Sequence, residues 1–379
     1  MDGLPPELLS IISNELSAVD LRVLRQLNKT WHGVVTPRAF RCLVISSINI
    51  RRSEGLANIL QGGPDGLASH IREIDYWDWY SRRSSRIDNI DGTQVMSRNE
   101  KRLVASLERA FSLISNAREL STLNQSAILL AIIRALESGL SLHSLTIVNF
   151  SVLRSPFWNH PSFSALRTLS EFHIATLSDP DEDPISDQTY PNDPLSQFWE
   201  GFFPQRIMQT LNGSSNLTKL SLHTDQLVGI IPSFSFDPFT FPHLTSLSLH
   251  RFFMHKMTGI EDFIVRHNAT LESLVLKHCY IALYGGRETM RWSQIWNRFA
   301  EELTHLKVFA AREEYEAARL DTDEPQYFVS RYLKVVDGLG FIPYATPLPG
   351  EEDDEIALSQ LEALVRGRCR LLGYPSGSH

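Results

Sequence analysis

The stretch Leu271-Glu272-Ser273-Leu274-Val275-Leu276-Lys277-His278-Cys279 has leucine at its first, fourth and sixth positions. Apolar residues two apart lie on one face of a β-strand, so this stretch predicts a short strand with one buried face. The same spacing recurs in three further stretches, at residues 142–152, 217–227 and 244–254. The last three of the four copies begin about 27 residues apart, so the strand recurs with a regular period.

Weaker copies and helices complete this pattern. Leu303-x-x-Leu306-x-Val308 is a fifth copy, and Leu166-x-x-Leu169 is a degenerate one. Helical spacing of apolar residues occupies 195–211, 258–268 and 292–303. A strand and a helix of this size cannot bury their apolar sides alone, whereas stacked copies close a core behind a parallel sheet. The pattern is that of leucine-rich repeats and predicts an α/β solenoid over residues 40–310, the alternative being an ordinary α/β domain.

The segments around the repeats are less regular. Strands are predicted at 40–46 and 71–76, helices at 98–116 and 126–138, and a short strand at 117–123. The acidic, proline-rich stretch 179–194 predicts an extended surface loop. After residue 310 the pattern stops, and residues 311–379 are expected to form a C-terminal cap. It would contain a last strand at 333–336, a proline-rich loop at 343–350, and a helix at 356–368 with the solvated acidic run 351–355 at its entrance.

The first 39 residues predict three short helices. Ser17 with Asp20 is a capping pair for the second helix, and Asn28 can cap the third. Pro37 is expected to limit the third helix, since the residue before a proline avoids the α region. These helices carry more apolar surface than they can hide from water, which indicates a segment that docks on a partner.

The stretch from Leu4 to Trp31 resembles an F-box without a gap. The positions that match the family pattern are Leu4, Pro5, Glu7, Leu8, Leu9, Ile12, Leu16, Asp20, Leu21, Leu24 and Trp31. The sequence departs from the pattern at Ser17-Ala18, where the family often has Asp-Pro, at Leu27, where it favours Val, and at Asn28, where it often has Cys or Ser. With the repeats, the arrangement resembles fungal F-box proteins that carry irregular leucine-rich repeats.

The resemblance implies a short all-α F-box module at 1–39 that binds the adaptor subunit of an SCF-type cullin–RING ubiquitin ligase, and through it the cullin. The residues expected to carry adaptor binding, by contact or by packing, are Leu4, Pro5, Leu8, Ile12, Leu16, Leu21, Leu24 and Trp31. The repeats would hold a target protein. The expected function is therefore substrate recognition without chemistry. The alternatives are a repeat scaffold with no degradative role and an enzyme with a dispersed site.

Two groups of residues are candidates for target binding. His223, His250 and His278 follow repeat strands and would lie close together on a parallel sheet, as a recognition strip or simply as outward-facing polar residues. Trp77, Trp79, Arg82 and Arg83 form the most unusual local composition in the chain. Aromatic and arginine side chains can form a protein-binding hot spot, stack on bases, or pack beneath a loop.

Composition narrows the class of protein. The net charge of −8 disfavours a dedicated nucleic-acid binder, which needs a basic face. Three widely separated cysteines provide neither a disulfide framework nor a metal pair, and they favour a reducing compartment, the cytoplasm or the nucleus. We expect no secretory signal and no transmembrane helix, because no apolar run is long enough. No motif predicts a catalytic site, a cofactor or a metal.

Overall fold

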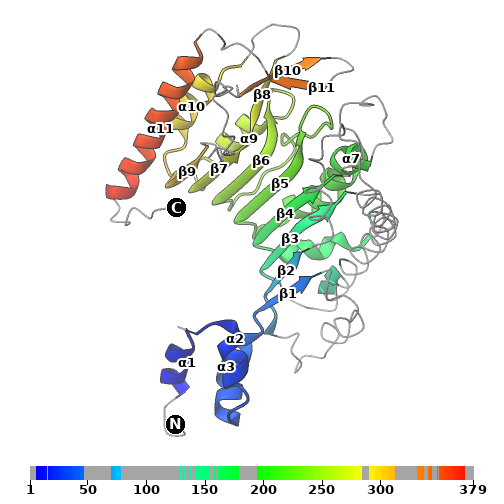
Figure 1. Cartoon of the computed structure of the whole chain (residues 1–379), viewed down its shortest axis with the longest axis vertical. Coiled ribbons are helices and arrows are strands. Elements are labelled where there is room, and N and C mark those ends of the chain that lie inside the picture. The colour runs from blue at the N-terminus through cyan, green and yellow to red at the C-terminus, as the bar shows by residue number, and fades with distance from the viewer. Residues whose placement is uncertain are drawn as a thin grey trace, which may run out of the picture. The chain divides into compact units, whose positions relative to one another are not determined.

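The computed structural model divides the chain into two compact units, residues 1–150 with 155–169, and residues 151–154 with 170–379 (Figure 1). The structure describes residues 6–14, 16–46, 70–77, Leu129, 132–133, 136–137, 142–152, Trp158, 161–178, 194–283, 290–311, 331–336, 340–343, Leu348 and 350–371. The predicted elements at 98–116 and 117–123, most of the helix at 126–138, and nearly all of the loop at 179–194 lie outside these residues.

The first unit contains the three short helices α1 (Pro6–Asn14), α2 (Ala18–Leu24) and α3 (Lys29–Ala39). Both predicted caps are confirmed. The Ser17 hydroxyl accepts a hydrogen bond from the Asp20 amide, and the Asn28 side chain accepts one from the Trp31 amide at 2.9 Å. The prediction for Pro37 is wrong, because α3 continues through this proline to Ala39. Only two helical residues follow Pro37, so little of the helix is affected by the missing N–H group.

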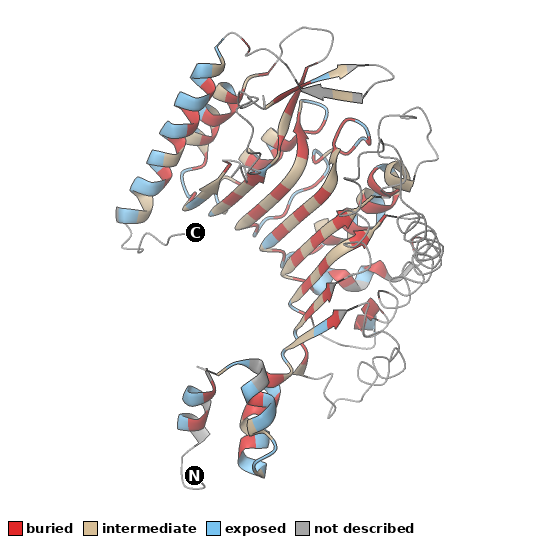
Figure 2. Ribbon diagram, viewed as in Figure 1, coloured by how far each residue is buried: buried red, intermediate tan, exposed pale blue. Residues whose placement is uncertain are grey.

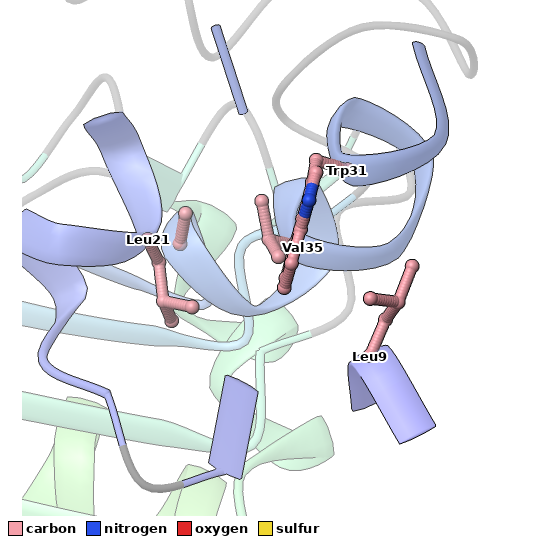
Figure 3. Packing of buried hydrophobic residues seen from close by; sticks show 5 residues of the cluster. Leu9, Leu21, Trp31 and Val35 are labelled. Carbon is pink, nitrogen blue, oxygen red and sulfur yellow. The ribbon is translucent and has the colours of Figure 1, made fainter. Parts of the chain in front are cut away.

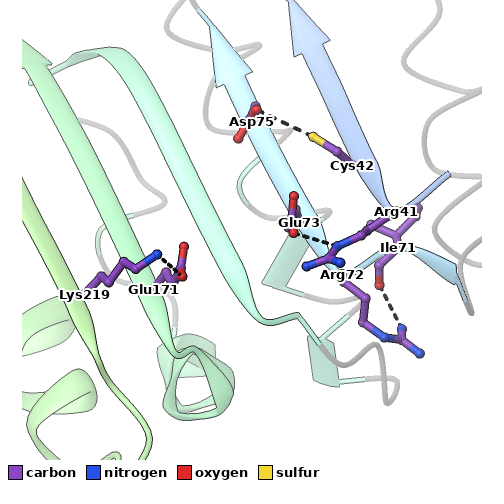
Figure 4. Close-up of polar contacts among 8 residues, drawn as sticks. All are labelled: Arg41, Cys42, Ile71, Arg72, Glu73, Asp75, Glu171 and Lys219. Carbon is purple, nitrogen blue, oxygen red and sulfur yellow. Dashed lines mark hydrogen bonds and ion pairs between the residues drawn. The ribbon is translucent and has the colours of Figure 1, made fainter. Parts of the chain in front are cut away.

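Three parallel strands follow in the same unit: β1 (Cys42–Ser46), β2 (Glu73–Trp77) and β3 (Ser144–Ser151). Ile74 pairs with both Leu43 and Leu145, so the two strands predicted at 40–46 and 71–76 are in register with a repeat copy. An ion pair of 2.8 Å between Arg41 and Glu73 joins the starts of β1 and β2 (Figure 4). The two strands predicted at 40–46 and 71–76 therefore pair with the first repeat copy, within the range 40–310 that was predicted for the repeats.

The second unit is built on a parallel sheet in which consecutive strands lie side by side (Figure 1). Its strands are β4 (Glu171–Leu177), β5 (Lys219–Val228), β6 (Ser246–Met254), β7 (Ser273–Lys277) and β9 (Val308–Ala310). Leu222, Leu249 and Leu276 pair in a row across β5, β6 and β7, and each is at most 2% exposed. Buried and half-buried residues alternate along these strands, as the banding in Figure 2 shows. The expected parallel sheet is confirmed.

Two repeat copies were placed three residues too early. Phe172 pairs with Leu220, so the copy on β4 is Leu169-x-x-Phe172-x-Ile174 rather than Leu166-x-x-Leu169. Phe309 pairs with Leu274, which moves the fifth copy to Leu306-x-x-Phe309-x-Ala311. Val308, expected to be buried, is 44% exposed. Leu166 and Leu303 are also buried. Leu166 lies in the last turn of the helical segment Pro161–Thr168 and Leu303 directly follows the helix Trp292–Glu302, and this extra leucine shifted the pattern.

A repeated backbone feature marks the ends of three copies. The non-glycine residues with positive φ in the described part of the chain are Asn149 (φ 60°), Arg251 (φ 65°) and His278 (φ 50°). Each lies two residues after the third apolar position of its repeat copy, and the residue that follows it is buried. Positive φ is uncommon for such residues, so its recurrence at one position shows that the three copies share a local geometry.

Helices and aromatic side chains fill the core of the second unit. The segment from α7 (Pro194–Ser196) through the π-helical η5 (Gln197–Met208) to α8 (Gln209–Asn212) is continuous, as expected for 195–211. Trp199 of η5 contacts Phe252 of β6, with ring centroids 5.7 Å apart. The shorter α9 (Ile260–Arg266) lies between β6 and β7 in the chain and contributes buried Phe263.

The C-terminal part contains β8 (Tyr280–Leu283), α10 (Trp292–Glu302), β10 (Tyr332–Val336), β11 (Gly340–Pro343) and α11 (Glu351–Leu371). Two expectations need correction. Residues 340–343 form a strand antiparallel to β10 that was not predicted, and it includes Pro343, which was expected to begin the loop. The acidic run is the first turn of α11 instead of its entrance. Asp354 in that run is only 7% exposed, because it accepts hydrogen bonds from the Tyr332 hydroxyl and the Ser293 amide.

Candidate partner-binding surfaces

The three N-terminal helices share a small core. Leu9 of α1, Leu21 of α2, and Trp31 and Val35 of α3 are each at most 3% exposed. Their side chains point toward one another in the space between the helices (Figure 3). Leu16 and Leu24 are half-buried against the same cluster. This core accounts for only part of the apolar content that the sequence analysis noted.

The remaining apolar residues of α1 lie on its outer face. Leu8 is 46% exposed, Ile11 is 60% exposed and Ile12 is 42% exposed. Residues three and four apart share one side of a helix, so the three form a continuous apolar row next to the buried side that carries Leu9. Val23 and Leu27, at and just beyond the end of α2, are exposed to 60% and 62%. The module therefore presents apolar surface that its own core does not use, which is typical of an interaction site.

The structure separates the residues predicted to carry adaptor binding into three groups. Leu8 and Ile12 are exposed, Leu16 and Leu24 are half-buried, and Leu21 and Trp31 belong to the core. Leu4 and Pro5 lie outside the described residues.

Ile11, Val23 and Leu27 are exposed but were not among the residues predicted to bind the adaptor. The spacing of Ile11 three residues after Leu8 was the available signal for the first of them. The contact of any of these residues with an adaptor stays a prediction.

A second candidate surface is the half-exposed face of the sheet in the second unit. His223 on β5 pairs with His250 on β6, and His250 pairs with Lys277 on β7. Two residues earlier along the strands, on the same face, His173 on β4 pairs with Ser221, and Ser221 pairs with Ser248. In-register strands therefore place small hydroxyl side chains and imidazoles in two adjacent rows on one face.

Hydrogen bonds link the residues of these two rows. Nδ1 of His173 lies 2.7 Å from the Ser221 hydroxyl, which lies 3.1 Å from Nε2 of His223. The same nitrogen lies 3.1 Å from the Ser248 hydroxyl. Ring centroids are 4.8 Å apart for His173 and His223, 5.5 Å for His223 and His250, and 4.9 Å for His250 and His278.

The structure thus brings the three predicted histidines together and adds His173, which the sequence analysis missed. Its signal was a position between two apolar residues of β4, Phe172 and Ile174, equivalent to that of Ser221 on β5.

Burial and neighbouring positive groups keep two of these histidines neutral. Loss of solvation, together with the adjacent imidazoles and Lys277, lowers the pKa of His223 from 6.5 to about 3. Loss of solvation also lowers the pKa of His250 to about 4, assisted by His278, Arg251 and Lys277. An imidazole with so low a pKa is a weak general base at neutral pH, although His223 contacts two serine hydroxyls. The arrangement favours recognition through hydrogen bonds over proton transfer.

The other candidate ligands and nucleophiles show no such grouping. Within the described ranges, no cluster of three His, Cys, Asp or Glu side chains is arranged to hold a metal ion. All three cysteines are free, and burial beside Asp75 raises the pKa of Cys42 to about 11 (Figure 4).

Trp77 is the last residue of β2, but its side chain and the residues Trp79, Arg82 and Arg83 lie outside the part of the chain that the structure describes. No described helix is long and apolar enough to cross a bilayer.

The low pKa values of His223 and His250 predict acid sensitivity. Between pH 6.5 and about 4 the unfolded chain binds protons at these two side chains and the folded chain does not, so stability falls as the pH falls. The unfolding equilibrium constant should change by up to about tenfold per pH unit for each histidine. The change is smaller where solvent screens the charge of the imidazole. Asp225 opposes this trend, because burial raises the pKa of its carboxyl group. Urea unfolding at pH 7.5 and 5.5 measures the net effect.

The control for this prediction is a variant without the two ionisable groups. His223→Gln/His250→Gln should show a smaller loss of stability between the two pH values than the wild type. His243→Gln, at an exposed position, should match the wild type. An equal loss in the double variant would show that other groups cause the acid sensitivity.

Comparison with known families agrees with the geometry of the N-terminal helices. The family model of the F-box domain matches residues 1–43. No curated protein matches the chain. F-box domains generally bind the adaptor subunit of SCF-type ubiquitin ligases, which connects them to a cullin, and proteins that carry them generally serve as substrate receptors. Residues 1–43 of this chain, which include α1, α2 and α3, are an F-box domain.

Proposed function

We propose that this protein is the target-recognition subunit of an SCF-type cullin–RING ubiquitin ligase. Its F-box domain binds the adaptor, and its parallel sheet, as part of a leucine-rich-repeat solenoid, holds a target protein. The protein performs no chemistry itself. It raises the effective concentration of the target near the ubiquitin-charged enzyme.

The exposed apolar row on α1 carries the first part of this proposal. Leu8, Ile11 and Ile12 are exposed while Leu9 and Leu21 complete a separate core. Burying an apolar side chain of this size contributes about 1.5–3 kcal/mol, so the row can supply much of a stable contact. An apolar helix face laid into a complementary groove is a common mode of protein recognition.

Features of the sheet support the second part. Strands of one pattern pair in register, and the residue with positive φ recurs at one position of three copies. Stacked copies of this kind present their strands as one extended face, which repeat proteins use for binding. The two rows of imidazole and hydroxyl side chains, named here the His–Ser rows, place hydrogen-bond donors and acceptors on that face. The polar groups of a target can pair with them.

A repeat scaffold that binds the adaptor without directing degradation is the second candidate. It would use the same two surfaces, so the geometry of the binding sites is the same for both functions. The fate of the bound protein separates them. Three free cysteines suit a reducing compartment for either function, and we place the protein in the cytoplasm or nucleus.

Affinity purification with mass spectrometry, with and without proteasome inhibition, tests the proposal. Wild-type protein should recover the adaptor, the cullin and at least one protein that accumulates when the proteasome is inhibited. The variant Leu8→Asp/Ile12→Asp should recover the target without adaptor or cullin. A bound protein whose half-life does not respond to proteasome inhibition would favour the scaffold, and equal recovery of adaptor by the variant would contradict the proposed contact.

A further inference from the structure

Four residues in the middle of β6 and at the end of β7 form a compact group, named here the basic quartet: His250, Arg251, Lys277 and His278. His250 pairs with Lys277 across the two strands. Arg251 and His278 occupy the equivalent positive-φ position of their two copies. The rings of His250 and His278 lie 4.9 Å apart. Each strand therefore contributes one imidazole and one permanent cation to the same place.

In the part of the chain that the structure describes, neither cation of the quartet forms an ion pair with a carboxylate. Among the described ion pairs, none involves Lys277, which is exposed, or Arg251, which donates a hydrogen bond to the backbone carbonyl of Asp225. The Asp225 carboxylate accepts hydrogen bonds from the amide and hydroxyl of Ser178, at 3.0 Å and 2.9 Å, and it interacts with the charge of Arg251 without a direct ion pair.

Two other lysines of this unit, Lys219 and Lys307, differ from Lys277 in this respect. Lys219 contacts Glu171 at 2.7 Å, and Lys307, next to β9, contacts Glu272 at 2.7 Å. Asp225 therefore compensates Arg251 only in part, without direct contact, and among the described residues no carboxylate pairs with Lys277, on a chain whose net charge is −8.

The imidazoles provide hydrogen-bonding capacity beside this charge. Nε2 of His250 is buried and has no hydrogen-bond partner within the described part of the chain. Its low pKa, caused first by burial and then by His278, Arg251 and Lys277, is the expected response of a neutral group to nearby positive charge. An anion at this place would find two cations and could accept a hydrogen bond from an imidazole N–H.

We propose that the basic quartet binds an anionic side chain, carboxylate or phosphate, of a target segment lying across the middle of β6 and the end of β7. This inference rests on the proposed role of the sheet in target binding and specifies the chemistry of the target. The partner is a protein segment, because the quartet lies beside the His–Ser rows that suit peptide hydrogen bonding and the overall charge disfavours nucleic acid.

Fluorescence anisotropy with the full-length chain and labelled synthetic peptides tests this inference. The probes are a peptide in which glutamates alternate with glycine and serine, the same peptide with phosphoserine at the glutamate positions, and the same peptide with glutamine there. At low salt the anionic peptides should bind about tenfold more tightly than the glutamine peptide, and added salt should reduce the difference. Tighter binding of the phosphoserine peptide would identify phosphate as the group, and tighter binding of the glutamate peptide would identify carboxylate.

Variants assign the binding to the quartet. Lys277→Glu should weaken binding of the anionic peptides by about tenfold, because attraction is replaced by repulsion. Lys334→Glu makes the same charge change at an exposed position of β10 and should leave the affinity within about twofold. The milder variants Lys277→Gln and Arg251→Asn, the latter chosen because asparagine tolerates positive φ, should each weaken binding about two- to fivefold.

Equal binding of the glutamine peptide, or equal losses for Lys277→Glu and Lys334→Glu, would overturn the inference. Adaptor recovery is measured on the same variants and should be unchanged. Loss of peptide discrimination with normal adaptor recovery would reject only the quartet. Failure of the wild type to recover the adaptor would reject the receptor role while leaving the peptide result intact.

Discussion

The double substitution Leu8→Asp/Ile12→Asp is expected to abolish adaptor binding while leaving the F-box domain folded. Both side chains are more than 40% exposed, so their replacement leaves the core around Leu9 unchanged. Each lost apolar contact is worth about 1.5–3 kcal/mol, and a buried charge adds to the cost. Together they predict at least a hundredfold weaker adaptor binding, about 3 kcal/mol or more, measured by titration of purified adaptor.

A matched control makes the same charge change on another helix. Thr30→Asp/Gly33→Asp places two carboxylates on the exposed side of α3, where a Cβ at Gly33 would meet no neighbour within 4 Å. This control should bind the adaptor normally, and both double variants should unfold within about 0.5 kcal/mol of the wild type. Normal adaptor binding by the α1 variant would show that this row is not the contact.

Replacing Trp31 by alanine is expected to unfold the F-box domain itself. Trp31 is 3% exposed and packs with Leu9, Leu21 and Val35, so its truncation leaves a large cavity in a small core. Such changes cost about 3–5 kcal/mol, which is comparable to the total stability of a module of this size. Hydrogen exchange of the amides in α1–α3 should accelerate strongly, while the amides of β5–β7 keep their protection.

The two variants lose adaptor binding for different reasons, and exchange distinguishes them. Trp31→Ala should lose both binding and protection, whereas the α1 double variant should lose binding alone. Trp31→Phe, which keeps an aromatic ring, should show a smaller effect, and Lys29→Ala at an exposed position of α3 should show none. Retained protection in Trp31→Ala would mean that the helices are held by contacts outside this core.

Local spacing was sufficient for the sheet and the helix caps. The leucine spacing predicted parallel strands whose side chains alternate, and the pairing of Leu222, Leu249 and Leu276 confirms it. A side chain's face in a strand depends only on its position parity, so this information is local. The caps at Ser17 and Asn28 are equally local, because each side chain bonds an amide three residues later.

Register could not be settled in the same way. On β4 and β9 a leucine of the preceding helical segment imitated the first strand position, and the pattern was assigned three residues early. Only pairing with the next strand distinguishes the two alignments, since both place apolar residues at plausible spacings. The strand at 340–343 was missed for a related reason, because its pairing with β10 is a contact between segments and its last residue is a proline.

By itself, the sequence determined an F-box pattern, a repeated strand and three histidines at comparable positions. Tertiary structure decided which apolar side chains are exposed and which are buried. Leucines of α1 look alike in the sequence, yet Leu9 is buried and Leu8 exposed, because α2 and α3 cover only one side of the helix. His173 joined the histidine group, and Lys277 joined His250, only through strand pairing. A binding surface is formed by residues that are distant in the chain and adjacent in space. Local composition therefore does not predict which residues form it.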